Sequence, residues 1–62
     1  MNKQTPEPIR INKYLSQAGY GSRRKVEELV RQRRVQVDGE TIEDLSTRVT
    51  PDQVVKVDGT TI

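Results

Sequence analysis

The chain of 62 residues contains no cysteine, histidine, phenylalanine or tryptophan. Without cysteine it has neither disulfides nor thiolate metal sites. Without histidine it lacks the usual general base and the commonest zinc ligand. Two tyrosines are its only aromatic residues, so a core must be built mostly from valine, isoleucine and leucine. We therefore expect one small domain that binds a partner, with no metal and no cofactor.

Long hydrophobic runs are also missing. No stretch approaches the roughly 18 apolar residues of a membrane span, and the first residues include no apolar signal-peptide core. We expect a cytoplasmic monomer with no membrane partner and no small-molecule substrate.

The charges are divided unevenly along the chain. Residues 1–34 carry nine lysines and arginines against three acids, a net charge of +6. Residues 35–62 carry two basic residues against six acids, a net charge of −4. Such a division predicts that one face of the domain holds a polyanion while the other does not.

Two short helices are expected in the basic half. The first covers residues 12–18, with Asn12 as the capping residue and Gly19 as the stop. Ile11, Leu15 and Ala18 recur at helical spacing and predict its buried face. Lys13 and Gln17 lie on the opposite face.

The second helix is predicted from Ser22, another capping residue, to about Gln32. Val26, Leu29 and Val30 form its apolar stripe. The helix should end before Arg33, because Arg33 would return a charge to that buried face.

The acidic half has the two-residue period of strands. Asp-Gly turn signals follow each of two Val-rich segments, and residues 43–53 are predicted to be a polar connection with a turn at 50–52. We expect an α+β fold with two N-terminal helices packed on a small, mostly antiparallel sheet of three to four short strands. The expected strands are residues 35–37, 40–42, 54–57 and the beginning of one at 60–62.

Three segments in this order resemble a known family: RINKYLSQAGYGSRRKVEELV at 10–30, VQVDG at 35–39 and TPDQVVKVDG at 50–59. They are similar to the S-four domain, a small RNA-binding domain named for a ribosomal protein and also called the alpha-L motif. Residues 1–8 are polar with two prolines and are expected to form a flexible arm. The resemblance implies an RNA-binding domain at 9–59 and a truncated strand or linker at 60–62.

Within that family the sequence is most similar to the N-terminal domain of one group of ribosomal RNA pseudouridine synthases. The group comprises the A type of the small ribosomal subunit together with the B and F types of the large one. In those isomerases a catalytic domain with an R-L-D motif follows. This chain has no R-L-D motif. The resemblance therefore implies a binding domain that is not itself an enzyme, with catalysis located elsewhere in the parent protein.

The chain departs from the family at Arg33, where glycine is usual. A positive φ at that position is costly for any other residue. Either the turn is built differently, or Arg33 accepts strain of roughly 1 kcal/mol.

The strongest candidate site lies at the start of the second helix. Three cations at Arg23, Arg24 and Lys25 stand at the positive end of the helix dipole, a local conflict that often marks function. Phosphates favour this position. The alternative interpretation is a set of surface ion pairs four residues apart, namely 23–27, 24–28 and 27–31.

Other basic and polar residues extend this candidate site. The resemblance places Arg10, Asn12 and Lys13 beside the start of the second helix, although Asn12 is also explained as a cap and Lys13 as a solvated lysine. Tyr14 and Tyr20 are expected in the core or at its rim rather than stacked on bases. The predicted RNA-binding residues are Arg10, Asn12, Lys13, Ser22, Arg23, Arg24, Lys25, Arg31, Arg33 and Arg34.

The expected partner is structured ribosomal RNA, recognised by shape and phosphates. Three alternatives stay open at this point. The first is a stand-alone ribosome-associated RNA-binding protein. The second is a helix-turn-helix DNA binder, and the third is a protein-interaction module that uses its Val strands.

Overall fold

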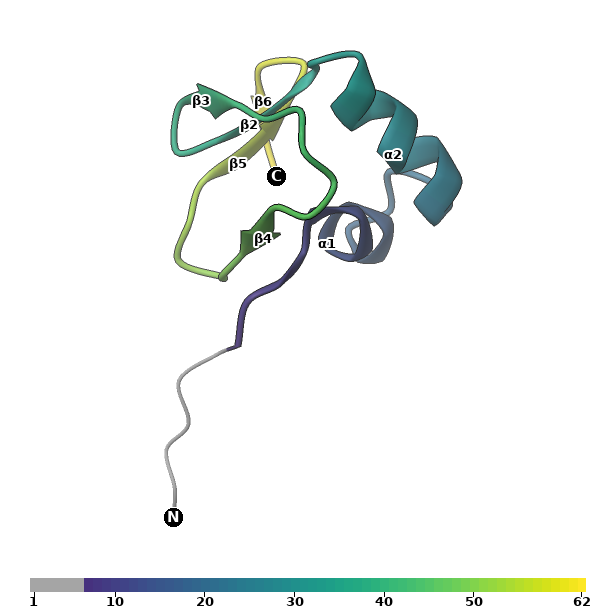
Figure 1. Cartoon of the computed structure of the whole chain (residues 1–62). Helices are drawn as coiled ribbons and strands as arrows, with labels where there is room; N and C mark the ends of the chain where they lie inside the picture. Colours follow the sequence, from purple (N-terminus) through teal and green to yellow (C-terminus); the bar gives the residue numbers. More distant parts are fainter. Residues whose placement is uncertain (1–6) are drawn as a thin grey trace.

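The computed structural model describes residues 7–62 and contains two helices and six short strands. In Figure 1 the helices lie on one side of the strands, and the first helix runs close to β4. The elements in chain order are β1 (Ile9–Arg10), α1 (Ile11–Gln17), α2 (Arg23–Arg31), β2 (Val35–Val37), β3 (Glu40–Thr41), β4 (Arg48–Val49), β5 (Val55–Val57) and β6 (Thr60–Thr61). Neither helix is long or apolar enough to cross a membrane within this described part.

The core is entirely aliphatic, as the composition predicted. Seven valines, two leucines and one isoleucine are buried, and no polar or charged side chain among residues 7–62 is buried with them. Both tyrosines are half-buried and pack against this core. They thus lie at the rim of the core, and the prediction that both rings belong to the core or its rim is confirmed.

The main sheet is antiparallel, with the strand order β3-β2-β5-β6. Its centre is the β2–β5 pair, in which Val35 faces Val57 and Val37 faces Val55. Each central strand turns through Asp-Gly into a two-residue outer strand, and both residues of each turn have positive φ. The four valines are buried, while Gln36 and Lys56 oppose each other at half-buried positions. The two predicted hairpins are confirmed.

A second sheet, β1–β4, was missed in the sequence. Ile9 pairs with Val49 and Arg10 with Arg48 in antiparallel register. Residues 48–49 lie inside the stretch predicted to be a plain polar connection. Val49 nevertheless has none of its surface exposed, because it packs in the aliphatic core where β4 contacts α1.

The first helix differs from its prediction at both ends. It begins at Ile11, so Asn12 lies within the helix, and no side chain caps its start. The backbone N–H of Ile11 instead donates to the carbonyl of Thr47 at 2.9 Å. Ala18 follows the last helical residue and is exposed, because the chain already turns away from the core there.

The second helix ends in a reverse turn that requires a left-handed residue. Arg33 has φ of 61°, and its N–H donates to the carbonyl of Val30 while that of Arg34 donates to Leu29. This pair of bonds defines the Schellman motif, whose left-handed position normally holds glycine. Arg33 therefore keeps the expected turn and accepts the strain.

Candidate nucleic-acid interface

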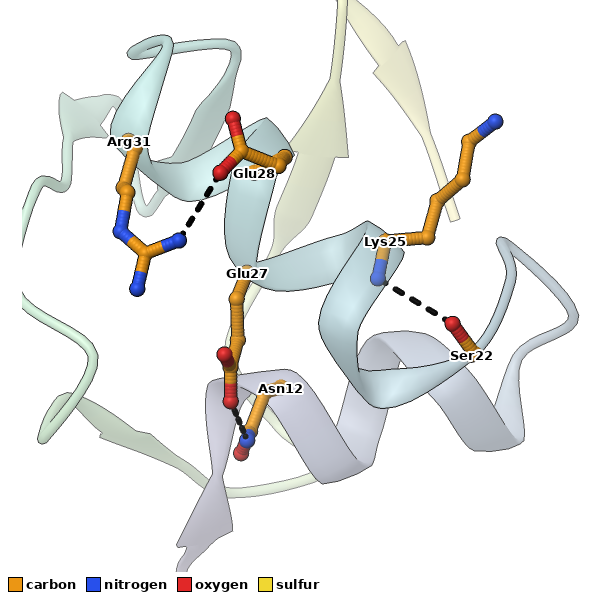
Figure 2. A network of polar contacts seen from close by, with 6 residues as sticks. All are labelled: Asn12, Ser22, Lys25, Glu27, Glu28 and Arg31. Carbon is orange, nitrogen blue, oxygen red and sulfur yellow. Dashed lines mark hydrogen bonds and ion pairs between the residues drawn. The ribbon is translucent and has the colours of Figure 1, made fainter.

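A polar side-chain contact joins the two helices beside the candidate site, in addition to their shared apolar core. The Asn12 amide Nδ2 donates to Glu27 Oε2 at 2.9 Å in a half-buried position (Figure 2). This bond explains Asn12 as a link between helices, so the capping prediction is wrong. It also occupies Glu27, which the alternative interpretation had paired with Arg23 or Arg31.

The start of α2 is built as predicted. Ser22 adopts an extended backbone, and its Oγ accepts a hydrogen bond from the backbone N–H of Lys25 at 3.2 Å. Arg23, Arg24 and Lys25 are all exposed. In Figure 2 the Lys25 ammonium points away from the other side chains that are drawn. Among residues 7–62, none of these three cations forms an ion pair.

Gly21 shapes the space beside Lys25. Its φ is 135°, a conformation that suits only glycine, and an added Cβ would lie 2.9 Å from Lys25 Cγ. The aliphatic stem of Lys25 thus packs against the glycine backbone. This packing directs the ammonium outward from the first turn of α2.

Residues far apart in the sequence form a basic depression next to this turn. Four cations, one each from β1, α1, α2 and β4, line it together with Glu7, Pro8 and Ile9. We call it the basic notch, and its cations are Arg10, Lys13, Arg23 and Arg48. The structure therefore brings together three predicted residues. It adds Arg48, whose place in the acidic half of the sequence concealed it.

Three other predicted cations, Arg31, Arg33 and Arg34, lie around the other end of α2 and are paired with carboxylates. Arg31 pairs with Glu28 at 2.9 Å, three residues away rather than four. Arg33 pairs with Glu43 at 2.8 Å, and both interactions are exposed. At 1.5 Å per residue, Arg31 lies about 12 Å along the helix from Arg23.

Arg34 forms the most complete of these pairs. Its Nε and Nη2 donate to the two carboxylate oxygens of Asp58 at 2.8 and 2.6 Å. The side-chain hydrogen bonds from Arg34 lower the pKa of Asp58, and Asp58 in turn raises the pKa of Arg34. This fork joins the end of α2 to the β5–β6 turn.

Two further carboxylates serve turns in the acidic half. Hydrogen bonds from the Ser46 backbone N–H and hydroxyl lower the pKa of Asp44. A hydrogen bond from the Thr50 hydroxyl lowers the pKa of Asp52. These two acids thus stabilise the loops in which they lie.

A second depression lies on the other side of the first turn of α2. It is lined by Tyr20, Leu29, Val57 and Thr60 together with Lys25, Arg34 and Asp58. Lys25 is the cation there that no ion pair in residues 7–62 engages. The start of α2 therefore separates two hollows and presents cations to both.

Comparison with known proteins identifies the family. Residues 9–55 match the S4 domain, the S-four domain that the sequence resembles. The chain belongs to the S4 family of RNA-binding domains. An RNA pseudouridine synthase of Aquifex aeolicus, described as uncharacterized, is 50% identical over 52 residues, which are 82% of this chain and 21% of that protein. The ribosomal large subunit pseudouridine synthase B of Bacillus subtilis is 38% identical over 50 residues, 81% of this chain and 20% of that protein.

A solved structure shares the fold of this S4 domain. The crystal structure of a pseudouridylate synthase superposes with a TM-score of 0.75 at 18% identity, covering 81% of this chain and 22% of that one. The α+β architecture predicted from the sequence is thereby confirmed, and the helix-turn-helix alternative is wrong. The chain spans about a fifth of the length of the curated relatives it matches.

Proposed function

We propose that this S4 domain binds structured ribosomal RNA through the cations around the start of α2, as the RNA-binding part of a pseudouridine synthase. The observation that carries the proposal is the contrast between the two ends of the helix. Arg31, Arg33 and Arg34 each have a carboxylate partner at the far end. Cations at the near end have no such partner in residues 7–62, although the helix dipole opposes their placement there.

The arrangement suits phosphates rather than base edges. Arginine presents a planar fork of donors to phosphate oxygens, while lysine supplies a mobile charge. Both tyrosine rings are partly covered by the core, which leaves little aromatic surface for stacking. Folded RNA displays a fixed pattern of phosphates, and cations placed on a folded domain can recognise such a pattern by shape.

Salt-dependent titration tests this proposal. With four to six phosphate contacts, the affinity for a ribosomal RNA hairpin should fall with salt at a log–log slope of roughly −3 to −5. The triple variant Arg23→Ala, Arg24→Ala, Lys25→Ala should lose most of that slope while its thermal unfolding stays cooperative. A triple variant that keeps the affinity would contradict the assignment of the site. Equal or tighter binding to duplex DNA would contradict RNA as the ligand.

The pseudouridine synthase part of the proposal rests on the relatives named above. It predicts that the gene encodes an R-L-D catalytic motif after codon 62, and that the chain alone binds RNA without forming pseudouridine. A reading frame that closes at that codon would favour a stand-alone RNA-binding protein instead.

A further inference from the structure

Arg48 stands directly opposite Arg10 in the two-stranded β1–β4 ribbon. Residues in direct cross-strand register have Cβ atoms about 5 Å apart, and like charges in such pairs destabilise the ribbon. Both arginines are exposed, and neither forms an ion pair or side-chain hydrogen bond with any residue from 7 to 62. The ribbon thus keeps two like charges opposite each other without a carboxylate to neutralise them. Arg33 and Arg34, by contrast, each have a carboxylate partner.

Further positive charges from the two helices lie beside this arginine pair. Lys13 from the first turn of α1 and Arg23 from the start of α2 line the same notch. Glu7 is the one carboxylate among the lining residues, so the notch has a net charge of +3. Four cations with a single acid between them create a strongly positive local potential.

The backbone around Arg48 is firmly held. Val49 is fully buried beside it, and the carbonyl of Thr47 on its other side accepts the N–H of Ile11 at 2.9 Å. Arg48 is therefore carried on a short strand anchored at both ends, not on a free loop. A ligand that binds there meets a backbone that is already in place, so little backbone ordering entropy is lost.

We propose that the basic notch binds a backbone phosphate of the RNA and that Arg48 is an RNA-contacting residue. A phosphate between the opposed arginines would turn their repulsion into attraction, since each guanidinium offers two parallel donors to its oxygens. This inference rests on the proposed function. It extends the RNA-binding face beyond the helices to the β1–β4 ribbon and to a residue from the acidic half of the chain.

The experiment compares Arg48→Gln with Lys56→Gln in the 62-residue chain, titrated with a ribosomal RNA hairpin at several salt concentrations. Lys56 is the matched control, because it is the other basic residue of positions 35–62 and lies in β5 next to buried valines, outside the notch. We expect Arg48→Gln to lower the affinity about five- to tenfold and to reduce the salt slope by about one. We expect Arg48→Lys to recover much of the slope, and Lys56→Gln to change it little.

Thermal unfolding of the same variants checks the fold. Removing one member of a like-charged pair should leave the melting temperature of Arg48→Gln unchanged or higher. Unchanged RNA affinity in Arg48→Gln, or a loss equal to that of Lys56→Gln, would overturn the inference while leaving the proposed function intact. A wild-type chain that fails to bind the hairpin would overturn both.

Discussion

Asn12 in α1 and Glu27 in α2 are joined by a side-chain hydrogen bond of 2.9 Å across 15 positions of sequence. Each side chain belongs to a helix that carries cations of the proposed RNA-binding face. The bond therefore links the part of that face on α1 with the part on α2. Its removal should loosen the helix pair without exposing the aliphatic core.

Asn12→Ala is expected to lower the free energy of unfolding by about 1 kcal/mol, because Glu27 loses its donor in a half-buried position. Gln17→Ala, at an exposed position of the same helix, is the matched control and should change stability by less than about 0.5 kcal/mol. Urea unfolding of both variants measures the difference. Equal effects would mean that the bond contributes nothing specific.

Arg33→Gly is expected to be more stable than Arg33→Ala by about 1 kcal/mol, since both variants lose the exposed pair with Glu43 but only glycine adopts the φ of 61° without strain. Comparing the two variants with each other cancels the ion pair. Thermal unfolding of both measures the difference. Should the alanine variant unfold at the same or a higher temperature, the left-handed turn would not be strained.

Acid should remove the stabilisation that comes from the Arg34–Asp58 fork. The pKa of Asp58 is lowered below its ordinary value of 3.8, so the unfolded chain binds its proton first as pH falls. The contribution is therefore complete above about pH 5 and is lost as pH falls through the lowered folded pKa. Asp58→Asn should be less stable than wild type at about pH 7, and the difference should shrink towards about pH 2.

Chemical denaturation at a series of pH values measures this difference. Glu40→Gln is a suitable control, because Glu40 is an exposed carboxylate in β3 and forms no ion pair in residues 7–62. Its stability difference from wild type should stay small across the range. A pH-independent deficit in Asp58→Asn would point to lost turn geometry rather than to lost charge pairing.

Gly21→Ala should weaken RNA binding beyond its effect on stability. The new Cβ would press on Lys25 Cγ at 2.9 Å and displace the lysine stem, with an expected loss of affinity of about two- to fivefold at low salt. Gly19→Ala is the matched control: its φ is also positive, at 93°, but an added Cβ meets nothing within 4 Å. Both variants should lose about 1–3 kcal/mol of stability.

Titrations well below both melting temperatures separate the two effects. An equal loss of RNA affinity in the two glycine variants would show that the position of Lys25 is irrelevant. Wild-type affinity in Gly21→Ala would show that the position of the Lys25 stem does not affect RNA binding.

Local signals in the sequence were sufficient for most of the fold. Ser22 and the Val26-Leu29-Val30 stripe predicted the second helix within a residue at each end. Asp-Gly turns after Val-rich segments predicted both hairpins. In each case the residues that determine the element lie within a few positions of one another.

What the sequence did not reveal depends on long-range contacts. The β4 strand has two residues and no alternating pattern, and its partner β1 lies at the other end of the domain. Its formation depends on burying Val49, which a polar flanking sequence conceals. Arg48 was missed for the same reason, because summing charge along the chain assigned it to the acidic half.

Asn12 shows how a local signal can be correct in type and wrong in role. Asparagine is a good capping residue, but the N–H of Ile11, at the start of the helix, already donates a hydrogen bond to the carbonyl of Thr47. The residue before β4 thus satisfies the first N–H of the helix, and the amide of Asn12 donates to Glu27 instead.

The pairing of Arg10 with Arg48 also couples ligand binding to folding. The notch exists only when β1 and β4, which are far apart in the sequence, are paired. A chain in which this ribbon is open has no such site. A phosphate held there would bind the native state alone and stabilise it by mass action. The repulsion between the two arginines weakens the ribbon in the free protein. A phosphate bound between them would offset this repulsion and stabilise the ribbon.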